Sequence, residues 1–505
     1  MKSLTALIVL LILNATAACS TQDVTDAVVE SPAGPPFMAT GMKIGEVTAS
    51  EAIVWVRLTA VEKRVDFGAP MPKVTYTDVN TGESLEVKRG RRPTNAVPSV
   101  KFPDGSTIDT IEGAVPGAVG IARVYYKPEA DRESRVTAWQ KVDPDADFTT
   151  QFKLSDLLPG TQYLIKVEYG KVGYGATVYQ ELRILPGTFR TAPAADTVKA
   201  VTFTVVTGQR YPDRDSQDGF KIYPEMMKLD LDFFVHTGDI LYYDQFAKTP
   251  ALANWHWQRI YGMNSLVEFH NNVTSYFIKD DHDTLMNDSW PTMETHFMGE
   301  LTFEQGLEIF REQVPMGEKT YRTIRWGKDL QIWLVEGRDF RSANTMEDGP
   351  DKTIWGPEQM AWFKRTVQES DATFRVLISP TPVVGPDRDN KRDNHANIGF
   401  QHEGDLLREF IASQKNMVVA CGDRHWQYVS VDSTHGVKEY SSGPVSDKHA
   451  GGWKNDMLYP EHKYLNVIGG FLAITVERED GTPVLIARHH GVDGAILNED
   501  RVVAE

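Results

Sequence analysis

The sequence predicts an α/β fold that follows an all-β domain. From residue 201 onward, short apolar runs such as "VTFTVVTG" and "LDFFVHTGD" alternate with helical patterns such as "FKIYPEMMKLD". This alternation is typical of a sheet that helices cover. Between residues 38 and 195, short alternating runs such as "EAIVWVRLT" and "TQYLIKVEYG" are separated by Gly, Pro and Asn turns. That second pattern predicts a β-sandwich.

Length and composition favour two domains and exclude some partners. The chain has 505 residues, of which 41% are hydrophobic, and this is more than one core usually holds. The net charge is −17, without a basic block, so we expect no nucleic-acid-binding surface. A small phosphorylated substrate remains compatible, because bound cations can reverse the local electrostatic field.

The first residues have the layout of an export signal. "MKSLTALIVLLILNATAACS" contains one Lys, an apolar run and small residues before Cys19. Because Ala17-Ala18-Cys19 is similar to a bacterial lipobox, we predict lipidation of Cys19 and a periplasmic or membrane-anchored protein. Plain secretion after cleavage nearby is the alternative. If Cys19 is lipidated, Cys421 is the only remaining thiol and no intramolecular disulfide is expected.

The predicted organisation follows shifts in composition. We expect a signal peptide over residues 1–18, a tether over 19–37, the β-sandwich over 38–195, the α/β domain over 196–490 and a C-terminal tail over 491–505. Helices are expected at residues 252–270, 302–313, 357–369 and 402–413. The stretch 89–120 is irregular and is predicted to be an insertion between strands.

Polar side chains follow several strands of the α/β domain. One strand ends before Asp239 and Tyr242, another runs into "DDHD" at residues 280–283, and later strands are followed by "EGRD" and "GDRHW". Ligands of open α/β sheets collect outside the carboxyl ends of strands. Carboxylates, a phenol and imidazoles suit a site for two or more cations. A helix cap at Asp239 or a packing role for Tyr242 is the simpler reading of each residue alone.

Three ordered motifs carry a family resemblance. "GDILY", "DDHDTLMND" and "GDRHW", behind a β-rich amino-terminal domain, resemble the alkaline phosphatase D (PhoD-like) branch of the metallophosphoesterases. The resemblance covers about residues 38–490. It implies two facing sheets with helices outside, after a small β-sandwich. It also implies an enzyme that cleaves phosphomonoesters, phosphodiesters or both by in-line attack of metal-activated hydroxide.

The resemblance implies a set of metal ligands. Asp239 becomes the carboxylate that the metals share, and Tyr242 becomes the phenolate ligand of a ferric ion. Asp281 takes the place of the metal-binding Asn in the superfamily's "GNH" motif. Asp423 and His425 become the ligands of the last motif.

Further residues are candidates for contact with substrate or for direct or indirect metal binding. The resemblance makes His282 the group that contacts substrate and protonates the leaving group, and Arg338 the guanidinium that binds the phosphoryl group. Asn287 is a direct or indirect ligand candidate. The substrate-side candidates are Gln209, Arg210 and His395.

One position departs from the family pattern. Members usually carry Ser-Cys-Gln after the first catalytic strand, with the Cys thiolate on iron, whereas "VVTGQRY" has Gly208 there. The family implies calcium and iron, and Gly208 puts the iron in question. Gln209, a water molecule or a harder or borderline ion could complete the site. Cys421 is the other thiol, for which burial as a small packing residue is favoured over ligation.

Two alternative functions follow from the same observations. The fold could serve a phospholipid head-group hydrolase or a sulfate-ester hydrolase, because fold does not fix substrate. A noncatalytic surface protein that binds partners through the β-sandwich is the third reading, and the missing Cys supports it. The retained ligand set argues against that reading, because a binding module has no need of it.

The export hypothesis makes a direct prediction about Cys19. Cys19→Ser should release the protein from the membrane fraction, because one residue carries the lipid that anchors it. Fractionation of cells followed by immunoblotting measures this. An unchanged distribution would favour simple secretion.

Overall fold

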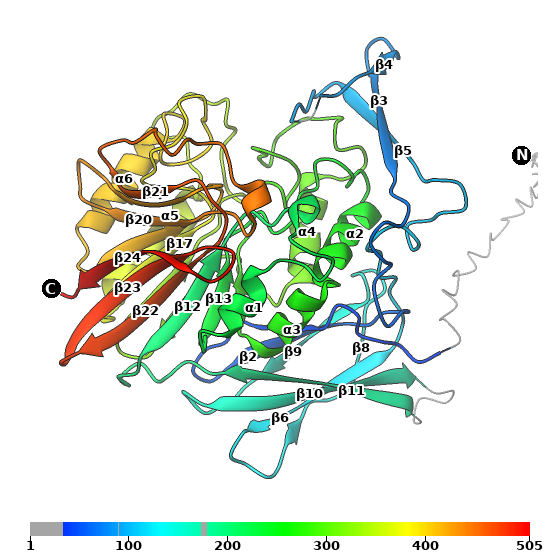
Figure 1. Ribbon diagram of the computed structural model, residues 1–505, viewed down its shortest axis with the longest axis horizontal. Coiled ribbons are helices and arrows are strands. Elements are labelled where there is room, and N and C mark those ends of the chain that lie inside the picture. Colours follow the sequence, from blue (N-terminus) through cyan, green and yellow to red (C-terminus); the bar gives the residue numbers. More distant parts are fainter. Residues whose placement is uncertain (1–33, 89, 173–178) are drawn as a thin grey trace, which may run out of the picture.

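The computed structural model describes residues 34–505, apart from residue 89 and residues 173–178 (Figure 1). The predicted signal peptide, most of the tether and Cys19 therefore lie outside the described residues. Residues 201–503 form an α/β part with two mixed sheets, and a β-rich part precedes it. No helix within the described residues is long and apolar enough to cross a membrane.

The first sheet of the α/β part has six strands in the order β14-β13-β12-β22-β23-β24. Their bounds are β12 (Val201–Val206), β13 (Phe233–His236), β14 (Ser275–Phe277), β22 (Phe471–Glu479), β23 (Thr482–His490) and β24 (Ile496–Val503). β12, β13 and β14 run parallel, whereas β22 pairs antiparallel with β12. The prediction of a C-terminal tail is wrong for residues 496–503, because β24 pairs along β23 as an edge strand.

The second sheet has seven strands in the order β15-β16-β17-β18-β20-β19-β21. Their bounds are β15 (Arg322–Trp326), β16 (Leu330–Leu334), β17 (Phe374–Ser379), β18 (Met417–Cys421), β19 (Gln427–Val431), β20 (Lys438–Ser442) and β21 (His462–Asn466). The central strands β16, β17, β18 and β20 run parallel to one another. Their carboxyl ends therefore lie at one edge of the sheet.

The two sheets pack face to face through alternate residues of each strand. Phe233 and Val235 of β13 point into the core between the sheets, while Phe234 points to the helices outside. The ring of Phe233 lies 4.5 Å from that of Phe203 and 4.7 Å from that of Trp326 in the other sheet. Each fully buried Phe stabilises this layer by about 1.5–3 kcal/mol. The predicted double-sheet sandwich is confirmed.

Helices cover the outer faces of both sheets, as Figure 1 shows. Their bounds are α1 (Ile222–Met227), α2 (Pro250–Tyr261), α3 (Asn264–Asn272), α4 (Phe303–Gln313), α5 (Gly356–Glu369) and α6 (Gln401–Ala412). The single helix predicted at 252–270 is two helices. Gly262 ends α2 and Met263 has extended backbone angles, so the chain turns before α3 begins.

The β-rich part contains a sandwich and a separate small sheet. The sandwich consists of β1 (Met42–Gly45), β2 (Ala52–Arg57), β9 (Thr149–Leu154), β6 (Ile121–Pro128), β7 (Arg135–Val136), β8 (Gln140–Lys141), β10 (Gln162–Val172) and β11 (Tyr179–Arg190). The small sheet, called the arm below, consists of β3 (Lys73–Asp78), β4 (Ser84–Leu85), β5 (Ala96–Lys101) and the loop before β5. It stands away from the sandwich beside α2 and α4 (Figure 1). The stretch predicted as an irregular insertion thus contains β5.

Candidate metal centre

Loops at the carboxyl ends of the parallel strands bring most predicted site residues together. Asp239 follows β13, Asp281 and His282 follow β14, and His425 follows β18. Gly238 allows the first two loops to approach, because a Cβ there would lie 2.6 Å from the backbone nitrogen of Asp280. Its φ of +99° is also one that glycine adopts readily.

Three side chains converge on the hydroxyl of Tyr242, and together with Tyr242 they are called the tyrosine cluster. The hydroxyl donates to Asp239 Oδ2 at 2.9 Å. It lies 3.2 Å from His425 Nε2 and 2.8 Å from His449 Nε2. His425 Nε2 is also 3.7 Å from Asp239 Oδ2. One carboxylate, one phenol and two imidazoles therefore present their ligand atoms to one small space.

His449 is the member of this cluster that sequence reasoning missed. It ends the short 3₁₀ helix η2 (Asp447–His449), and its Nδ1 bonds to Asp213 Oδ2 at 2.9 Å. Because a carboxylate only accepts, Nδ1 carries the proton and the lone pair of Nε2 faces Tyr242. A histidine whose second nitrogen is fixed by a carboxylate is typical of metal ligands. No local sequence motif marks it.

Gly208 lies directly against the two imidazoles. A Cβ on Gly208 would be 3.3 Å from His425 Cδ2 and 3.4 Å from His449 Cδ2. A side chain at this position would therefore point at the tyrosine cluster. Instead, the imidazole of His449 lies next to Gly208, and it is carried by η2, which follows β20 of the second sheet.

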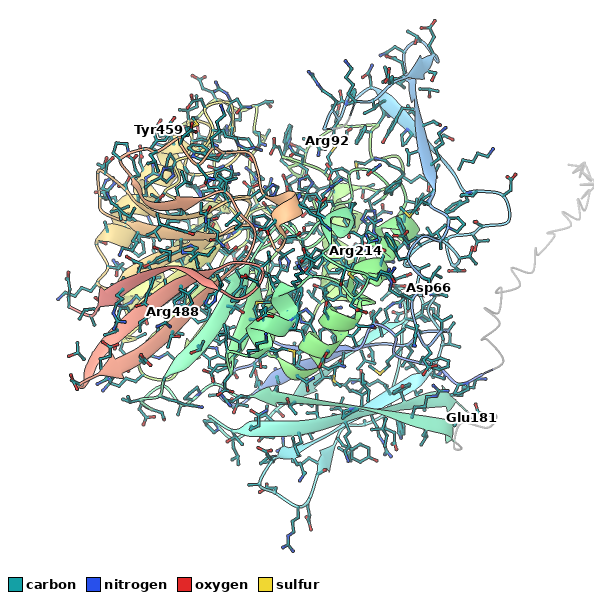
Figure 2. The ribbon with its side chains drawn as sticks, viewed as in Figure 1. Asp66, Arg92, Glu181, Arg214, Tyr459 and Arg488 are labelled. Carbon is teal, nitrogen blue, oxygen red and sulfur yellow. The ribbon has the colours of Figure 1, made fainter. Side chains whose placement is uncertain are left out.

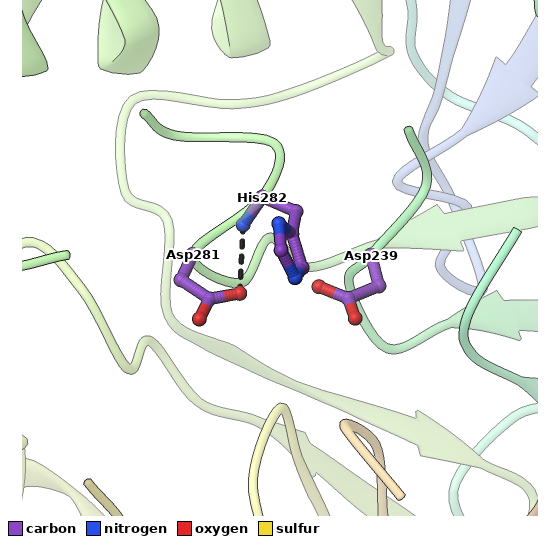
Figure 3. A group of neighbouring side chains, drawn as sticks. All are labelled: Asp239, Asp281 and His282. Carbon is purple, nitrogen blue, oxygen red and sulfur yellow. Dashed lines mark hydrogen bonds between the residues drawn. The ribbon is translucent and has the colours of Figure 1, made fainter. Parts of the chain in front are cut away.

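A second group shares Asp239 with the tyrosine cluster. Asp239, Asp281 and His282 each offer a ligand atom, and these atoms lie within 4.8 Å of one another. Figure 3 shows the imidazole of His282 between the two carboxylates, with its backbone nitrogen donating to Asp281 Oδ1 at 2.7 Å. Asp239 is thus the side chain through which the two groups meet.

The electrostatics of this region favour bound cations. Burial raises the pKa of Asp239 well above its usual range, and the charges of Asp281 and Asp283 add to this effect. Burial, together with the charges of Asp280 and Asp281, raises the pKa of Asp283 to about 8. Asp239 Oδ1 is buried without a hydrogen-bond partner in the described part of the chain. Metal ions would satisfy this oxygen and offset the repulsion, so the residues present fit them.

His282 is fixed on one side by a carboxylate. Its Nδ1 pairs with Asp244 Oδ2, and Asp244 Oδ1 accepts the backbone N–H of Asn287 at 3.0 Å. Burial would lower the pKa of His282, but the carboxylates of Asp244, Asp281 and Asp239 outweigh burial and raise it to about 10. Asn287 thus contributes to the site through its backbone.

Arg338 lies beneath the metal centre. Its Nε donates to Asp280 Oδ1 at 2.7 Å, its Nη1 donates to Ser289 O at 3.0 Å, and its Nη2 lies 3.8 Å from Asp281 Oδ2. The side chain is 0% exposed. In this position it neutralises Asp280 and supports Asp281, whereas its expected contact with a phosphoryl group remains a prediction.

Two residues predicted to bind substrate form hydrogen bonds inside the protein. Gln209 is fully buried, with its amide nitrogen 3.3 Å from Ile240 O and its amide oxygen accepting from Tyr223. His395 is also fully buried, and its Nε2 lies 2.9 Å from Glu403 Oε2. The polar atoms of both side chains thus form hydrogen bonds inside the protein, and their contact with substrate stays a prediction.

The remaining candidates, Arg210, Asp423 and Cys421, each have a different partner. Arg210 Nη1 donates to Asp213 Oδ2 at 2.9 Å, so it supports the carboxylate behind His449. The carboxylate of Asp423 pairs with the neighbouring Arg424 and is not brought into the group of Asp239, Asp281 and His282. The thiol of Cys421 lies 3.1 Å from the hydroxyl of Tyr428, inside the second sheet. Cys421 is thus a buried packing residue.

Comparisons with known proteins bear on the family and the fold of this chain. The family model described as PhoD-like phosphatase matches residues 203–466. A solved structure of PhoD superimposes with a TM-score of 0.67 at 15% identity, over 92% of this chain and 90% of that one. The purple acid phosphatase PPD1 from yellow lupin (Lupinus luteus) seeds gives a TM-score of 0.56 at 11% identity, over 92% and 74%. These two likenesses establish the fold. The sequence has no match among the curated proteins.

The buried pair of Arg338 and Asp280 predicts a large stability effect. Arg338→Met in metal-free protein should lower the free energy of unfolding by about 3–5 kcal/mol, because it leaves a buried carboxylate without its cation. Denaturant unfolding measures this. Arg365→Met is the control, since Arg365 forms an exposed pair with Glu369 at 3.4 Å and should change little. Equal losses in the two variants would contradict the assigned role.

Proposed function

Because this chain belongs to the PhoD-like phosphatase family, we propose that it is a metal-dependent phosphohydrolase that cleaves phosphomonoesters, phosphodiesters or both. The observation that carries the proposal is the position of Asp239, whose carboxylate lies close to both the tyrosine cluster and Asp281. A shared carboxylate can hold two cations close enough to act on one phosphoryl group.

The two groups of ligands differ in character. The tyrosine cluster combines a carboxylate, a phenol and two imidazoles, a set that suits a first-row transition metal such as iron. Asp239 and Asp281 offer oxygen atoms, which suit a harder divalent ion such as calcium. When bound, such ions polarise the phosphoryl oxygens, neutralise their charge and activate water.

The chain itself supplies orientation and a proton. Because Asp244 holds Nδ1 of His282, Nε2 is the ring nitrogen that remains for substrate. From there it can give its proton to the ester oxygen as the bond between phosphorus and that oxygen breaks. The carboxylate keeps the ring in one orientation during this transfer.

The proposal also covers the location of the protein and the size of its substrate. The signal-like first residues and Cys19 favour an exported, lipid-anchored protein. A small phosphoester is the proposed substrate, since the net charge of −17 disfavours large polyanions.

Replacing the shared carboxylate tests the function. Asp239→Asn should lower kcat on phosphate mono- and diesters by about 100-fold or more, because it weakens both cation sites at once. Hydrolysis of 4-nitrophenyl phosphate and bis(4-nitrophenyl) phosphate measures this, with circular dichroism as the check on folding. Asp230→Asn is the control, since the Asp230 side chain is 88% exposed. Full activity in folded Asp239→Asn protein would refute the proposal.

The tyrosine cluster predicts a spectroscopic signature. Protein loaded with ferric ion should absorb visible light through a tyrosinate bond to iron, and Tyr242→Phe should abolish that band. His449→Gln should weaken iron binding by about 10–100-fold, because it removes one imidazole and its link to Asp213. Elemental analysis and titration followed by absorbance measure these effects, with His435→Gln, outside the cluster, as the control. Unchanged iron content and spectrum in His449→Gln would exclude it as a ligand.

A further inference from the structure

The arm packs against the α/β part next to the metal centre. The ring of Tyr76 in β3 stacks on Phe297 at 5.1 Å. The backbone nitrogen of His296 donates to Thr94 O at 2.9 Å. Leu85 of the arm also packs against the helical core of the α/β part. These contacts fix the loop before β5 close to the residues that follow β14.

This loop carries Arg92 to the carboxylate that orients His282. The Nε of Arg92 donates to Asp244 Oδ1, while Asp244 Oδ2 pairs with His282 Nδ1. The Arg92 and Asp244 side chains are 22% and 12% exposed, so solvent screens their interaction only in part. Figure 2 labels Arg92 on the side of the arm that faces the α/β part. A chain of three side chains thus links the β-rich part to the metal centre.

Arg92 has no evident substitute in this role within the described residues. Lys248 is near, but its Nζ donates to the backbone oxygens of Asp244 and Phe297, at 2.6 and 2.9 Å. The backbone N–H of Asn287 is the other hydrogen-bond donor to Asp244 Oδ1 in the described part of the chain. A guanidinium adds charge and a fixed donor direction, which together hold a carboxylate plane.

We propose that Arg92 is a positioning residue of the active site, which holds Asp244 in the orientation that fixes the ring of His282. The inference rests on the proposed function and adds that the β-rich part supplies a component of the proton-transfer machinery. The proton passes from His282 Nε2 to the leaving oxygen, while the Nδ1 proton stays on the ring between His282 and Asp244. Arg92 contacts neither His282 Nε2 nor the leaving oxygen, and it acts through Asp244.

The test compares leaving groups. A nitrophenolate leaves without much protonation, whereas an alkoxide needs a proton in the transition state. Arg92→Gln should therefore lower kcat about 10-fold on n-butyl phosphate and less than about twofold on 4-nitrophenyl phosphate, with KM unchanged. Arg92→Lys should recover part of the loss, because it keeps the charge and loses the planar fork. Arg91→Gln is the matched control, an exposed neighbour that should behave as wild type.

A double-mutant cycle shows whether Arg92 acts through Asp244. In an Asp244→Asn background, Arg92→Gln should lower kcat on n-butyl phosphate no further, because both changes break the same link from Arg92 through Asp244 to His282. Equal losses on the two esters, or additive losses in the cycle, would overturn the inference.

A readout that needs no activity separates this inference from the proposed function. In metal-free protein, the downfield proton resonance of His282 Nδ1 is identified by its loss in His282→Gln. Arg92→Gln should shift and broaden this resonance, whereas Arg91→Gln should leave it in place. An unchanged resonance in Arg92→Gln overturns the positioning role even in an active enzyme. Wild-type protein that cleaves neither ester with any added metal refutes the proposed function, and the resonance then decides the role of Arg92 by itself.

Discussion

The metal centre is organised by four carboxylates that the fold buries at the ends of two neighbouring strands. Asp280 is neutralised by Arg338, whose Nε donates to it at 2.7 Å. Asp283 accepts the backbone N–H groups of Ile240 and of Asp280, each at 3.0 Å. Asp239 keeps an oxygen without a hydrogen bond, and Asp281 lies beside it. Since buried like charges must be compensated, the His282 imidazole between them offsets part of this charge, and bound cations would offset the rest.

The loop after β13 holds the Asp239 carboxylate at the site in a strained backbone conformation, which neighbouring hydrogen bonds fix. Asp239 has a φ of +53°, which is uncommon for a residue with a side chain. Such a conformation costs on the order of 1–3 kcal/mol and persists only where neighbouring contacts determine it. Here Gln209 N donates to Asp239 O at 2.7 Å, and Ile240 N is held by Asp283. The buried Gln209 therefore serves the site by shaping the loop that presents Asp239.

Local patterns predict the alternation of strands and helices in the α/β part, whereas the pair of facing sheets follows from the family resemblance. Apolar runs mark the parallel strands, and residues that follow such strands, such as Asp239 and His282, meet at one edge. His449 escapes prediction because η2 is brought to the site by long-range packing against η1 (Tyr211–Asp213). Arg92 escapes it because it belongs to the other part of the chain. Substrate binding by His395 stays a prediction, and the sequence does not show that Glu403 is its hydrogen-bond partner.

The ligand types of the tyrosine cluster set the charge that it offers to a metal. With the phenol ionised, Asp239 and Tyr242 contribute two negative charges, and the two imidazoles contribute none. A cysteinate at position 208 would make three, the charge that balances a ferric ion. The φ of +63° at Gly208 disfavours any side chain there, and His449 occupies the adjacent space. The two negative charges of this cluster would balance a divalent ion, and nitrogen and oxygen ligands of this kind suit divalent first-row metals.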